Sequence, residues 1–549
     1  MSRATRTTHP MKLRHLLAVS LLLGAPPPSR ADSPKLVVAI LVDQLRYDYL
    51  ERFKEQFGKG GFRLLMEEGA FLTFAHYNYS PTVTGPGHAS FLSGAPPSVH
   101  GIIGNEWFDK RTGKSLNCVA DPDVEGVGAT GSVGKRSPRN FTGSNLADEL
   151  RLRYRSKVVG ISLKDRGAIL PAGKKPAGAY WFDSASGNFI TSTHYMPELP
   201  NWVATFNARK VPASFIGQTW KRLLPESAYQ WEDELPGEGA AAGDRSKRFD
   251  HTVKLSAAEG FENIVPTPFG NQLLAEFAEA AIEGEHLGEG PHPDLLTISF
   301  SSPDAAGHIF GPYSQEVQDV TLRLDQQLAT LFGRLDRKIG LANVTVVLTA
   351  DHGVAPAPEF AHAQGLDGKR VDMTSLLGGL FAALEKQFGA GRFFLSQRMH
   401  DGAFYFDHSA LRERGIAAEA LAAAIRDWAL ETGHFQAAFT RGQLLDGRAP
   451  GALGQLVLNG FHPERSGDVI LVQKPFELSG TASVGTTHGS PYAYDTHIPV
   501  LFFGAGFKPG RYADSFSITD IAATLSAALR LSEPSGNMGA PLTKILSGR

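Results

Sequence analysis

A chain of 549 residues is too long for one small domain and long enough to bury a large hydrophobic core. Hydrophobic residues make up 42% of the chain and charged residues 20%, which is ordinary for a soluble globular protein. The 54 basic and 56 acidic side chains give a formal net charge of -2, so no overall field points to nucleic acid or an anionic membrane as a partner.

The N-terminal residues carry the pattern of an export signal. Basic residues between Arg3 and Arg14 precede an apolar run from Leu16 to Ala25, and a short segment ending at Ala31 follows. This order predicts a secretory signal over residues 1–31, cleaved near Ala31. A membrane anchor is the weaker interpretation, because the run has about half of the ~20 residues needed to span a bilayer. We therefore expect a periplasmic or secreted protein without a stable membrane anchor.

Apolar runs rich in β-branched residues recur along the chain. The first is Lys35–Val42 (KLVVAILV), the pattern of a strand buried on both faces. Similar runs lie at 157–163, 295–300, 344–348, 469–472 and 498–503. Helix-like stretches separate several of them, at 61–68, 316–335, 373–387, 417–431 and 518–531. The alternation predicts an α/β fold, a three-layer α/β/α sandwich around a mainly parallel sheet that binds ligands at the carboxyl ends of its strands.

Two segments interrupt this alternation. Residues 172–266 are rich in Gly, Ala, Pro and aromatic residues and have no sustained helical period. We expect them to form an insertion that walls or caps the active site. Residues 365–467 are expected to form a smaller α+β subdomain. The mature chain, 32–549, is interpreted as one catalytic domain that includes both segments.

Four sites with Asp or His stand out, most of them where a predicted strand ends. Asp43 directly follows the first apolar run, and taken alone it would favour a helix cap over a metal ligand. Asp304 and His308 follow the run at 295–300. Their spacing of four places both side chains on one face if the segment is helical, where they would converge on a single ion.

The other two sites lie further along the chain. Asp351 and His352 are adjacent, so they would face one ion only across a tight turn, and His488 lies in Thr486–Ser490 (TTHGS). Each site alone is more often structural, but four with carboxylates and imidazoles together indicate metal binding. Such ligands suit zinc better than magnesium. Two metals ~4 Å apart would bind the attacking and leaving oxygens of a phosphoryl displacement.

A hydroxyl nucleophile is expected among these ligands. The segment Tyr79–Ser90 offers Ser80, Thr82, Thr84 and Ser90. Thr84 is followed by Gly-Pro-Gly, where the backbone can turn sharply and begin a helix whose N-terminal amides favour a phosphate. A hydroxyl there needs activation by a base or a metal. Spacing alone does not separate Thr84 from Thr82.

The chain resembles the alkaline phosphatase superfamily, in particular its threonine-nucleophile branch. That branch includes the phosphate-insensitive bacterial alkaline phosphatases and the nucleotide pyrophosphatase/phosphodiesterases. The matching motifs are VDQLRYDYL, TGPGHASFLSGAPPSVHGIIGN, LKDRGAI, SFSSPDAAGHIFGP, LTADHGV, THGSPYAYDTHIPVLFFG and SITDIAATLSAAL. They span residues 36–531, nearly the whole mature chain, and as a set they are highly specific.

The resemblance implies a role for each candidate residue. Thr84 would be the nucleophile, phosphorylated and then dephosphorylated in each turnover. One zinc ion would be held by Thr84 with Asp43, Asp351 and His352, and a second by Asp304, His308 and His488. His497 is the rival of His488, but its place directly before the apolar run at 498–503 favours packing.

Lys164 and Arg166 follow the predicted strand 157–163, and alternate residues of a strand project to the same side. Two cations there would bind the non-bridging oxygens of a phosphoryl group, with Asn105 as a further donor. A monoester carries two negative charges and a diester one, so this set favours monoesters. LKDRGAI and the Gly-Asn pair also resemble the phosphomonoesterase branch.

These observations predict an exported, two-zinc alkaline phosphatase that hydrolyses small-molecule phosphate monoesters through a phosphothreonine. The main alternative is a phosphodiesterase or nucleotide pyrophosphatase with the same zinc sites, whose second ester group would sit against aromatic residues of segment 172–266. A non-catalytic protein that kept the fold, and a phosphonate hydrolase, are weaker alternatives. No nucleic-acid-binding role is expected.

Overall fold

The computed structural model describes residues 33–129, 131–241, 246–257 and 260–547. The predicted signal segment, residues 1–31, lies outside the described residues. Among the helices of the described part, none combines the length and the apolar character needed to cross a membrane.

The core of the molecule is an eleven-stranded sheet with the order β19-β2-β18-β12-β1-β11-β6-β7-β8-β5, in which β20 also pairs with β2. Strands β12, β1, β11, β6 and β7 run parallel, whereas β18 is antiparallel to both of its neighbours. Every residue of β1 is buried, as its continuous apolar run predicts. The strands are β1 (Leu36–Val42), β2 (Ala70–His76), β5 (Gly126–Val127), β6 (Val158–Ser162), β7 (Gly178–Asp183), β8 (Asn188–Ser192), β11 (Asp294–Phe300), β12 (Val344–Thr349), β18 (His497–Gly504), β19 (Gly510–Tyr512) and β20 (Phe516–Ser517).

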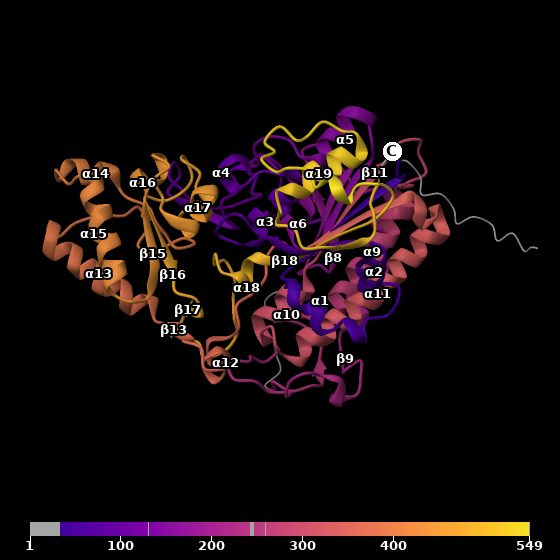
Figure 1. Ribbon diagram of the computed structural model, residues 1–549, viewed down its shortest axis with the longest axis horizontal. Coiled ribbons are helices and arrows are strands. Elements are labelled where there is room, and N and C mark those ends of the chain that lie inside the picture. The colour runs from indigo at the N-terminus through magenta and orange to yellow at the C-terminus, as the bar shows by residue number, and fades with distance from the viewer. Residues whose placement is uncertain (1–32, 130, 242–245, 258–259, 548–549) are drawn as a thin grey trace, which may run out of the picture.

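Helices cover both faces of this sheet (Figure 1). One layer contains α3 (Thr84–Ser93), α5 (Leu146–Tyr154), α6 (Asp165–Ile169) and α19 (Asp520–Leu529), and α3 contacts each of the other three. The opposite layer contains α2 (Phe62–Glu68), α9 (Pro268–Gly284) and α11 (Gln315–Ile339), with α7 (Asn201–Ala208) and α10 (Ser302–Phe310) packed against α9. The predicted three-layer α/β/α fold with a mainly parallel sheet is therefore confirmed.

A small lobe, residues 373–473, lies beside the sheet domain (Figure 1). Its antiparallel sheet has the order β14-β16-β15, and its own hydrophobic cluster includes Leu380, Phe404 and Ile425. The apolar run at 469–472 forms a strand as predicted, but this strand is β16 of the small lobe and not part of the central sheet. The lobe contains α13 (Met373–Phe388), β14 (Ala403–Phe404), α14 (His408–Glu413), α15 (Ala418–Glu431), β15 (Phe435–Thr440), α16 (Arg441–Leu445), α17 (Gly451–Gly460) and β16 (Val469–Gln473). The predicted boundaries of a subdomain at 365–467 stay a prediction.

The segment 172–266 contributes to the sheet domain itself. Its first part forms β7 and β8, and the side chains of Trp181 and Trp220 are 1% and 2% exposed. The rest forms α7, α8 (Val211–Phe215) and the short strands β9 (Thr219–Trp220) and β10 (His251–Thr252). The aromatic residues of this segment thus pack largely into the core, and its role as a cap stays a prediction.

Short elements complete the described part of the chain. They are α1 (Tyr47–Arg52), α4 (Pro97–His100), β3 (Glu106–Asp109), β4 (Lys114–Asn117), α12 (Pro358–Ala363), β13 (Lys369–Val371), β17 (Glu477–Ser479) and α18 (Ala493–Thr496).

Phe277 of α9 packs against aromatic residues of segment 172–266 and joins that segment to the main core. Its ring stacks on Phe189 at 3.7 Å between centroids and lies 5.1 Å from Trp202. Replacing Phe277 with alanine is expected to lower the free energy of unfolding by about 3–5 kcal/mol, because a buried ring is lost and a cavity remains. Urea unfolding followed by circular dichroism measures this. The exposed Leu152 is the control, and Leu152→Ala should cost less than about 0.5 kcal/mol. Equal losses for the two variants would contradict the prediction.

Candidate active site

The carboxyl ends of four neighbouring strands form the site. Strands β12, β1, β11 and β6 are adjacent and parallel, so the segments that follow them meet at one edge of the sheet. Asp43 comes directly after β1, Asp351 two residues after β12, and Lys164 two residues after β6. Asp304 lies in α10, the helix that follows β11. Helix α1 begins only at Tyr47, so Asp43 is not a helix cap.

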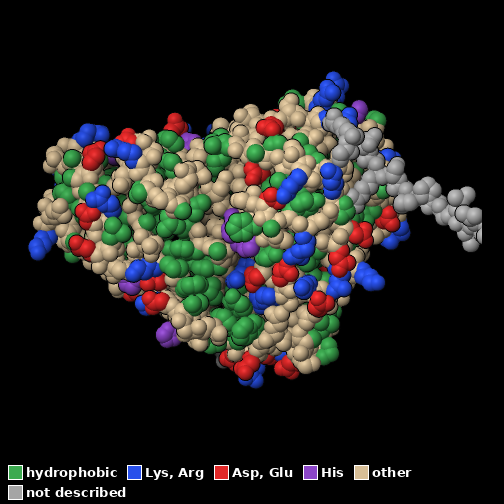
Figure 2. Space-filling view, viewed as in Figure 1, with side chains coloured by type: hydrophobic (Ala, Val, Ile, Leu, Met, Phe, Trp, Pro, Cys, Tyr) green, Lys and Arg blue, Asp and Glu red, His purple; other side chains and the backbone are tan. Residues whose placement is uncertain are grey.

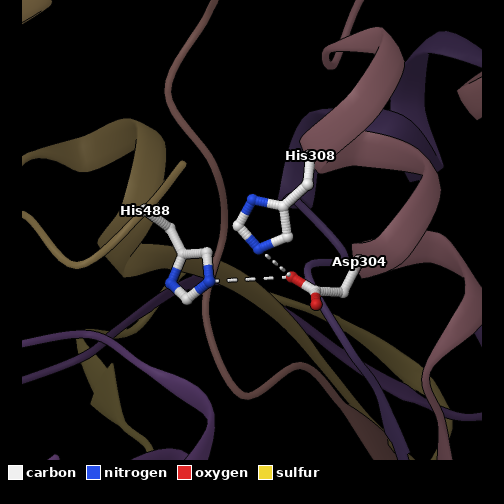
Figure 3. Close-up of side chains that lie close together, drawn as sticks. All are labelled: Asp304, His308 and His488. Carbon is white, nitrogen blue, oxygen red and sulfur yellow. Dashed lines mark ion pairs between the residues drawn. The ribbon is translucent and has the colours of Figure 1, made fainter. Parts of the chain in front are cut away.

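The first cluster consists of Asp304, His308 and His488 (Figure 3). Helix α10 places Asp304 and His308 on one face, as predicted, with His308 Nε2 3.2 Å from Asp304 Oδ1. His488 Nε2 lies 3.6 Å from the same oxygen. The Nδ1 atoms of the two imidazoles lie 2.8 and 2.9 Å from the carbonyl oxygens of Thr486 and Thr82. A carbonyl only accepts hydrogen bonds, so each Nδ1 carries a proton, and each Nε2 is the atom that a metal could bind in place of a proton.

The second cluster consists of Asp43, Asp351 and His352, all fully buried. His352 Nε2 lies 3.4 Å from Asp43 Oδ1 and 3.5 Å from Asp351 Oδ2, so a tight turn after β12 does bring the adjacent pair together. Asp304 is also within reach of a metal shared by Asp43 and His352. The rings of His352 and His488 stack at 3.4 Å between centroids, so the two clusters are in direct contact.

The buried polar atoms of the clusters fit divalent metal ions. Among the described residues, Asp43 Oδ1 and Asp351 Oδ2 are buried and have no hydrogen-bond partner. An unpaired buried carboxylate oxygen is costly, and a cation removes that cost. Burial and the neighbouring Asp43 raise the pKa of Asp351 well above its usual value. Burial lowers the pKa of His352 to about 3, so this imidazole stays neutral, the form that binds metals.

Lys164 lies between the carboxylates of the two clusters. Its Nζ is 2.6 Å from Asp43 Oδ2 and 2.5 Å from Asp304 Oδ2. Burial alone would lower the pKa of Lys164, but the two carboxylates more than offset this and raise it. Burial would raise the pKa of Asp304, yet His308 and Lys164 hold it well below its usual value. Both groups therefore stay charged, and a dense set of opposite charges occupies this edge of the sheet.

Thr84 is the first residue of α3, as its Gly-Pro-Gly context predicts. Its Oγ1 lies 3.5 Å from His352 Nε2, next to the second cluster. The following amide, of Gly85, donates a 2.6 Å hydrogen bond to Asn105 Oδ1, so Asn105 lies beside the start of the helix. Gly87 allows α3 to approach Asp351, because a Cβ there would lie 2.4 Å from the Asp351 carbonyl oxygen.

Lys164 and Arg166 reach the site from the start of a helix and not, as predicted, from alternate positions of a strand. Strand β6 ends at Ser162, whose Oγ accepts a 3.1 Å hydrogen bond from the Lys164 amide. Lys164 is the N-cap of α6 and Arg166 its second residue, so the expectation of alternate positions on a strand was wrong. The Nε of Arg166 is buried and has no hydrogen-bond partner in the described part of the chain. Although burial disfavours its charge, the carboxylates of Asp165, Asp43 and Asp304 help to raise the pKa of Arg166.

The structure separates two pairs of candidates. His497 lies outside both clusters, because its Nε2 bonds the Thr73 carbonyl at 3.1 Å and its ring stacks on Tyr47 and His76. Thr82 Oγ1 donates a 2.8 Å hydrogen bond to the Ser490 carbonyl. Of each pair, His488 and Thr84 therefore occupy the site.

Gln44 is a site residue that sequence reasoning missed. It is 1% exposed, its amide N–H donates to Asp351 Oδ1 at 3.1 Å, and its Nε2 donates to Asp304 Oδ1 at 2.6 Å. Its only signal in the sequence is the position directly after Asp43, which says nothing about these partners.

A cleft of about 910 Å³ lies between the small lobe and the sheet domain and reaches the site at His488. Its walls include Leu377, Phe381, Tyr492 and Tyr494. Figure 2 shows hydrophobic side chains gathered on the surface where the two parts meet. The site therefore has room for a large substituent on this side.

Several known proteins are similar to this chain in sequence and in fold. A sequence profile described as type I phosphodiesterase / nucleotide pyrophosphatase matches residues 37–483. The chain is 39% identical over 543 residues to alkaline phosphatase PafA from Elizabethkingia meningoseptica, which covers 97% of this chain and 98% of that protein. It is 37% identical over 528 residues to alkaline phosphatase PhoV from Synechococcus elongatus, covering 94% of each chain. The crystal structure of wild-type PafA matches with a TM-score of 0.89 at 38% identity, covering 95% of this chain and all of that one.

The fold and these matches define a phosphoric ester hydrolase whose site contains groups able to bind metal. The chain belongs to the type I phosphodiesterase / nucleotide pyrophosphatase family, and its similarity to alkaline phosphatases covers nearly the whole chain. The resemblance inferred from the motifs is thereby confirmed.

Proposed function

We propose that this protein is an exported, two-zinc alkaline phosphatase that hydrolyses phosphate monoesters through a phosphothreonine at Thr84. The observation that carries the proposal is the position of Thr84 Oγ1. It lies at the start of α3, 3.5 Å from His352 Nε2, beside two contacting clusters of carboxylates and imidazoles.

Each zinc ion has a distinct set of ligands in this proposal. The first cluster, Asp304, His308 and His488, would hold one ion, and the second cluster with Thr84 would hold the other. When bound, the ions supply Lewis-acid chemistry, which lowers the pKa of hydroxyl groups and offsets negative charge on oxygens.

The side chains of the protein account for the remaining steps. The Thr84 hydroxyl loses its proton to solvent and its oxygen forms a bond to phosphorus as the bond to the leaving oxygen breaks. The leaving oxygen takes up a proton from water and departs as the alcohol. Water then hydrolyses the phosphothreonine and releases inorganic phosphate. Lys164, Arg166 and Asn105 would hold the non-bridging oxygens throughout, and this preorganised charge stabilises the transition state.

The same three residues favour a monoester over a diester. A monoester group presents two negative charges to Lys164 and Arg166, whereas a diester presents one and adds a bulky substituent. The alternative function relied on aromatic residues of segment 172–266 to bind that substituent, but Trp181 and Trp220 are buried in the core. PafA and PhoV, two alkaline phosphatases that match nearly the whole chain, also support monoesterase activity.

The deciding experiment compares two substrates. The purified mature protein is assayed with para-nitrophenyl phosphate and with bis-para-nitrophenyl phosphate, and its zinc is counted. A large preference for the monoester, with roughly two zinc ions per chain, is the expected result. Preference for the diester would assign the chain to the phosphodiesterases instead.

A separate experiment tests export. The N-terminal sequence of the protein secreted from a Gram-negative host is determined, and we expect it to begin near residue 32.

His488 and His497 provide a matched pair for testing the metal ligands. His488→Ala is expected to remove one of two zinc ions after dialysis and to lower activity by about 10²-fold or more, because a direct ligand is lost. His497→Ala should keep both ions, since its ring packs against Tyr47, His76 and nearby groups of β2, away from both clusters. Plasma mass spectrometry of the dialysed proteins gives the zinc content. Zinc loss in His497→Ala alone would refute the assignment.

A further inference from the structure

Gln44 connects the two clusters. Its backbone N–H donates to Asp351 Oδ1 of the second cluster, and its side-chain Nε2 donates to Asp304 Oδ1 of the first. The same Asp304 oxygen faces His308 Nε2 and His488 Nε2, so the Gln44 amide holds the atom through which Asp304 would meet a metal. One buried residue therefore orients a carboxylate of each cluster.

The backbone of Gln44 adopts an uncommon conformation. Its φ is +67°, in the left-handed region that non-glycine residues seldom occupy. This turn directs the chain away from β1 immediately after Asp43 and lets the Gln44 amide face Asp351. The hydrogen bonds to the two carboxylates stabilise a conformation that would otherwise be unfavourable.

Gly307 makes room for the Gln44 side chain. A Cβ at Gly307 would lie 1.7 Å from Gln44 Oε1 and 2.8 Å from its Cδ, and the three nearest heavy atoms all belong to Gln44. Gly307 lies inside α10, directly before His308, where alanine is the better helix former. Among the described residues, the Gln44 amide is therefore the group that would clash with an alanine at this position.

We propose that Gln44 and Gly307 form a positioning pair that sets the spacing between the two metal-binding clusters. Gly307 lets the Gln44 amide lie against α10, and the amide then fixes Asp304 relative to Asp351. The inference rests on the proposed function only in taking both clusters as zinc sites. Residues that orient metal ligands typically change metal affinity by 10–100-fold when they are replaced.

Zinc affinity tests the side-chain donor. Gln44→Met keeps the length of the side chain but removes its N–H groups, so packing is largely preserved. We expect its weaker zinc site to lose affinity by about 10–100-fold in competition with a chelator, whereas the melting temperature of the metal-free protein changes by only a few degrees. Unchanged zinc affinity in Gln44→Met would overturn the proposal. A loss of affinity accompanied by collapse of the metal-free protein would show a purely structural role and would also overturn it.

A double-mutant cycle tests the pair. Gly307→Ala is expected to weaken zinc binding about as much as Gln44→Met, because the new methyl group displaces the amide. In a Gln44→Ala background the same substitution should have no further effect, since the clashing atoms are gone. Gly378→Ala in α13, where a Cβ has no neighbour within 4 Å, is the control and should leave affinity unchanged. Additive losses from Gln44→Ala and Gly307→Ala would overturn the pair.

These measurements separate the pair from the proposed function. Zinc affinity does not depend on the substrate, so a wild-type protein that prefers diesters would contradict the monoesterase while leaving the pair intact. A wild-type protein that binds no zinc would overturn both.

Discussion

Thr84→Ala is expected to lower kcat for para-nitrophenyl phosphate by about 10³-fold or more, because no other hydroxyl takes the place of the nucleophile. The Thr84 oxygen lies beside His352 at the start of α3, and alanine leaves this position without an oxygen. Steady-state kinetics give kcat. Acid quenching during turnover of ³²P-labelled phosphate ester gives the second readout, a labelled protein for the wild type and none for Thr84→Ala.

Thr82 is the matched control for this experiment. It is a buried threonine two residues away, but its Oγ1 bonds the Ser490 carbonyl. Thr82→Ala is therefore expected to keep the labelled phosphoprotein and to lose less than about tenfold in kcat, because a single neutral hydrogen bond is lost. Thr84→Ser should retain substantial activity, since it keeps the hydroxyl. A labelled protein in Thr84→Ala would contradict the assignment of the nucleophile.

The double substitution Lys164→Ala/Arg166→Ala is expected to lower monoester hydrolysis by about 10⁴-fold, at about 10²-fold for each charged donor. Diester hydrolysis should fall far less, so the preference for monoesters collapses. The reason is electrostatic: both cations are largely buried, and the second negative charge of a monoester gains most from them. The ratio of kcat/KM for para-nitrophenyl phosphate and its bis ester is the measurement.

Two controls make this result specific. Arg153→Ala removes an exposed cation of α5 and should leave the ratio unchanged. Zinc content must also be measured, because Lys164 contacts Asp43 and Asp304 and its removal changes the charge of both clusters. If the double variant keeps its zinc and hydrolyses monoesters normally, these cations do not select the substrate.

Much of the site follows from short stretches of sequence. Asp43 and Asp351 each follow a buried strand, and the sheet brings the carboxyl ends of its parallel strands to one edge. Asp304 and His308 needed only a helical spacing of four, and α10 supplies it. The spacing of residues in the sequence did not decide which threonine is the nucleophile or which of two histidines is a ligand. The structure separates Thr84 from Thr82, and His488 from His497, through their hydrogen-bond partners.

Local patterns failed where the same residues suit more than one environment. The run at 469–472 is apolar and β-branched, yet it pairs within the small lobe, because periodicity does not name a strand's partners. The aromatic residues of segment 172–266 suggested a slot for a second ester group, but Tyr180, Trp181 and Phe182 are buried in the core, with Tyr180 against Phe277 of α9. The spacing of Lys164 and Arg166 suggested alternate positions of a strand, whereas Lys164 is the N-cap of α6 and its amide donates to the Ser162 hydroxyl at the end of β6.

By itself the sequence determined the α/β class, the family and the chemical nature of the site residues. The α/β class depends on burial patterns and the site chemistry on side-chain types, which are properties of single segments, whereas the family follows from the set of matching motifs. Only the tertiary structure decided which atoms meet, as with Gln44, 260 residues before Asp304 and 307 before Asp351. Such contacts arise when distant segments pack at one sheet edge. Their geometry depends on how the whole core packs, and no local sequence pattern specifies that packing.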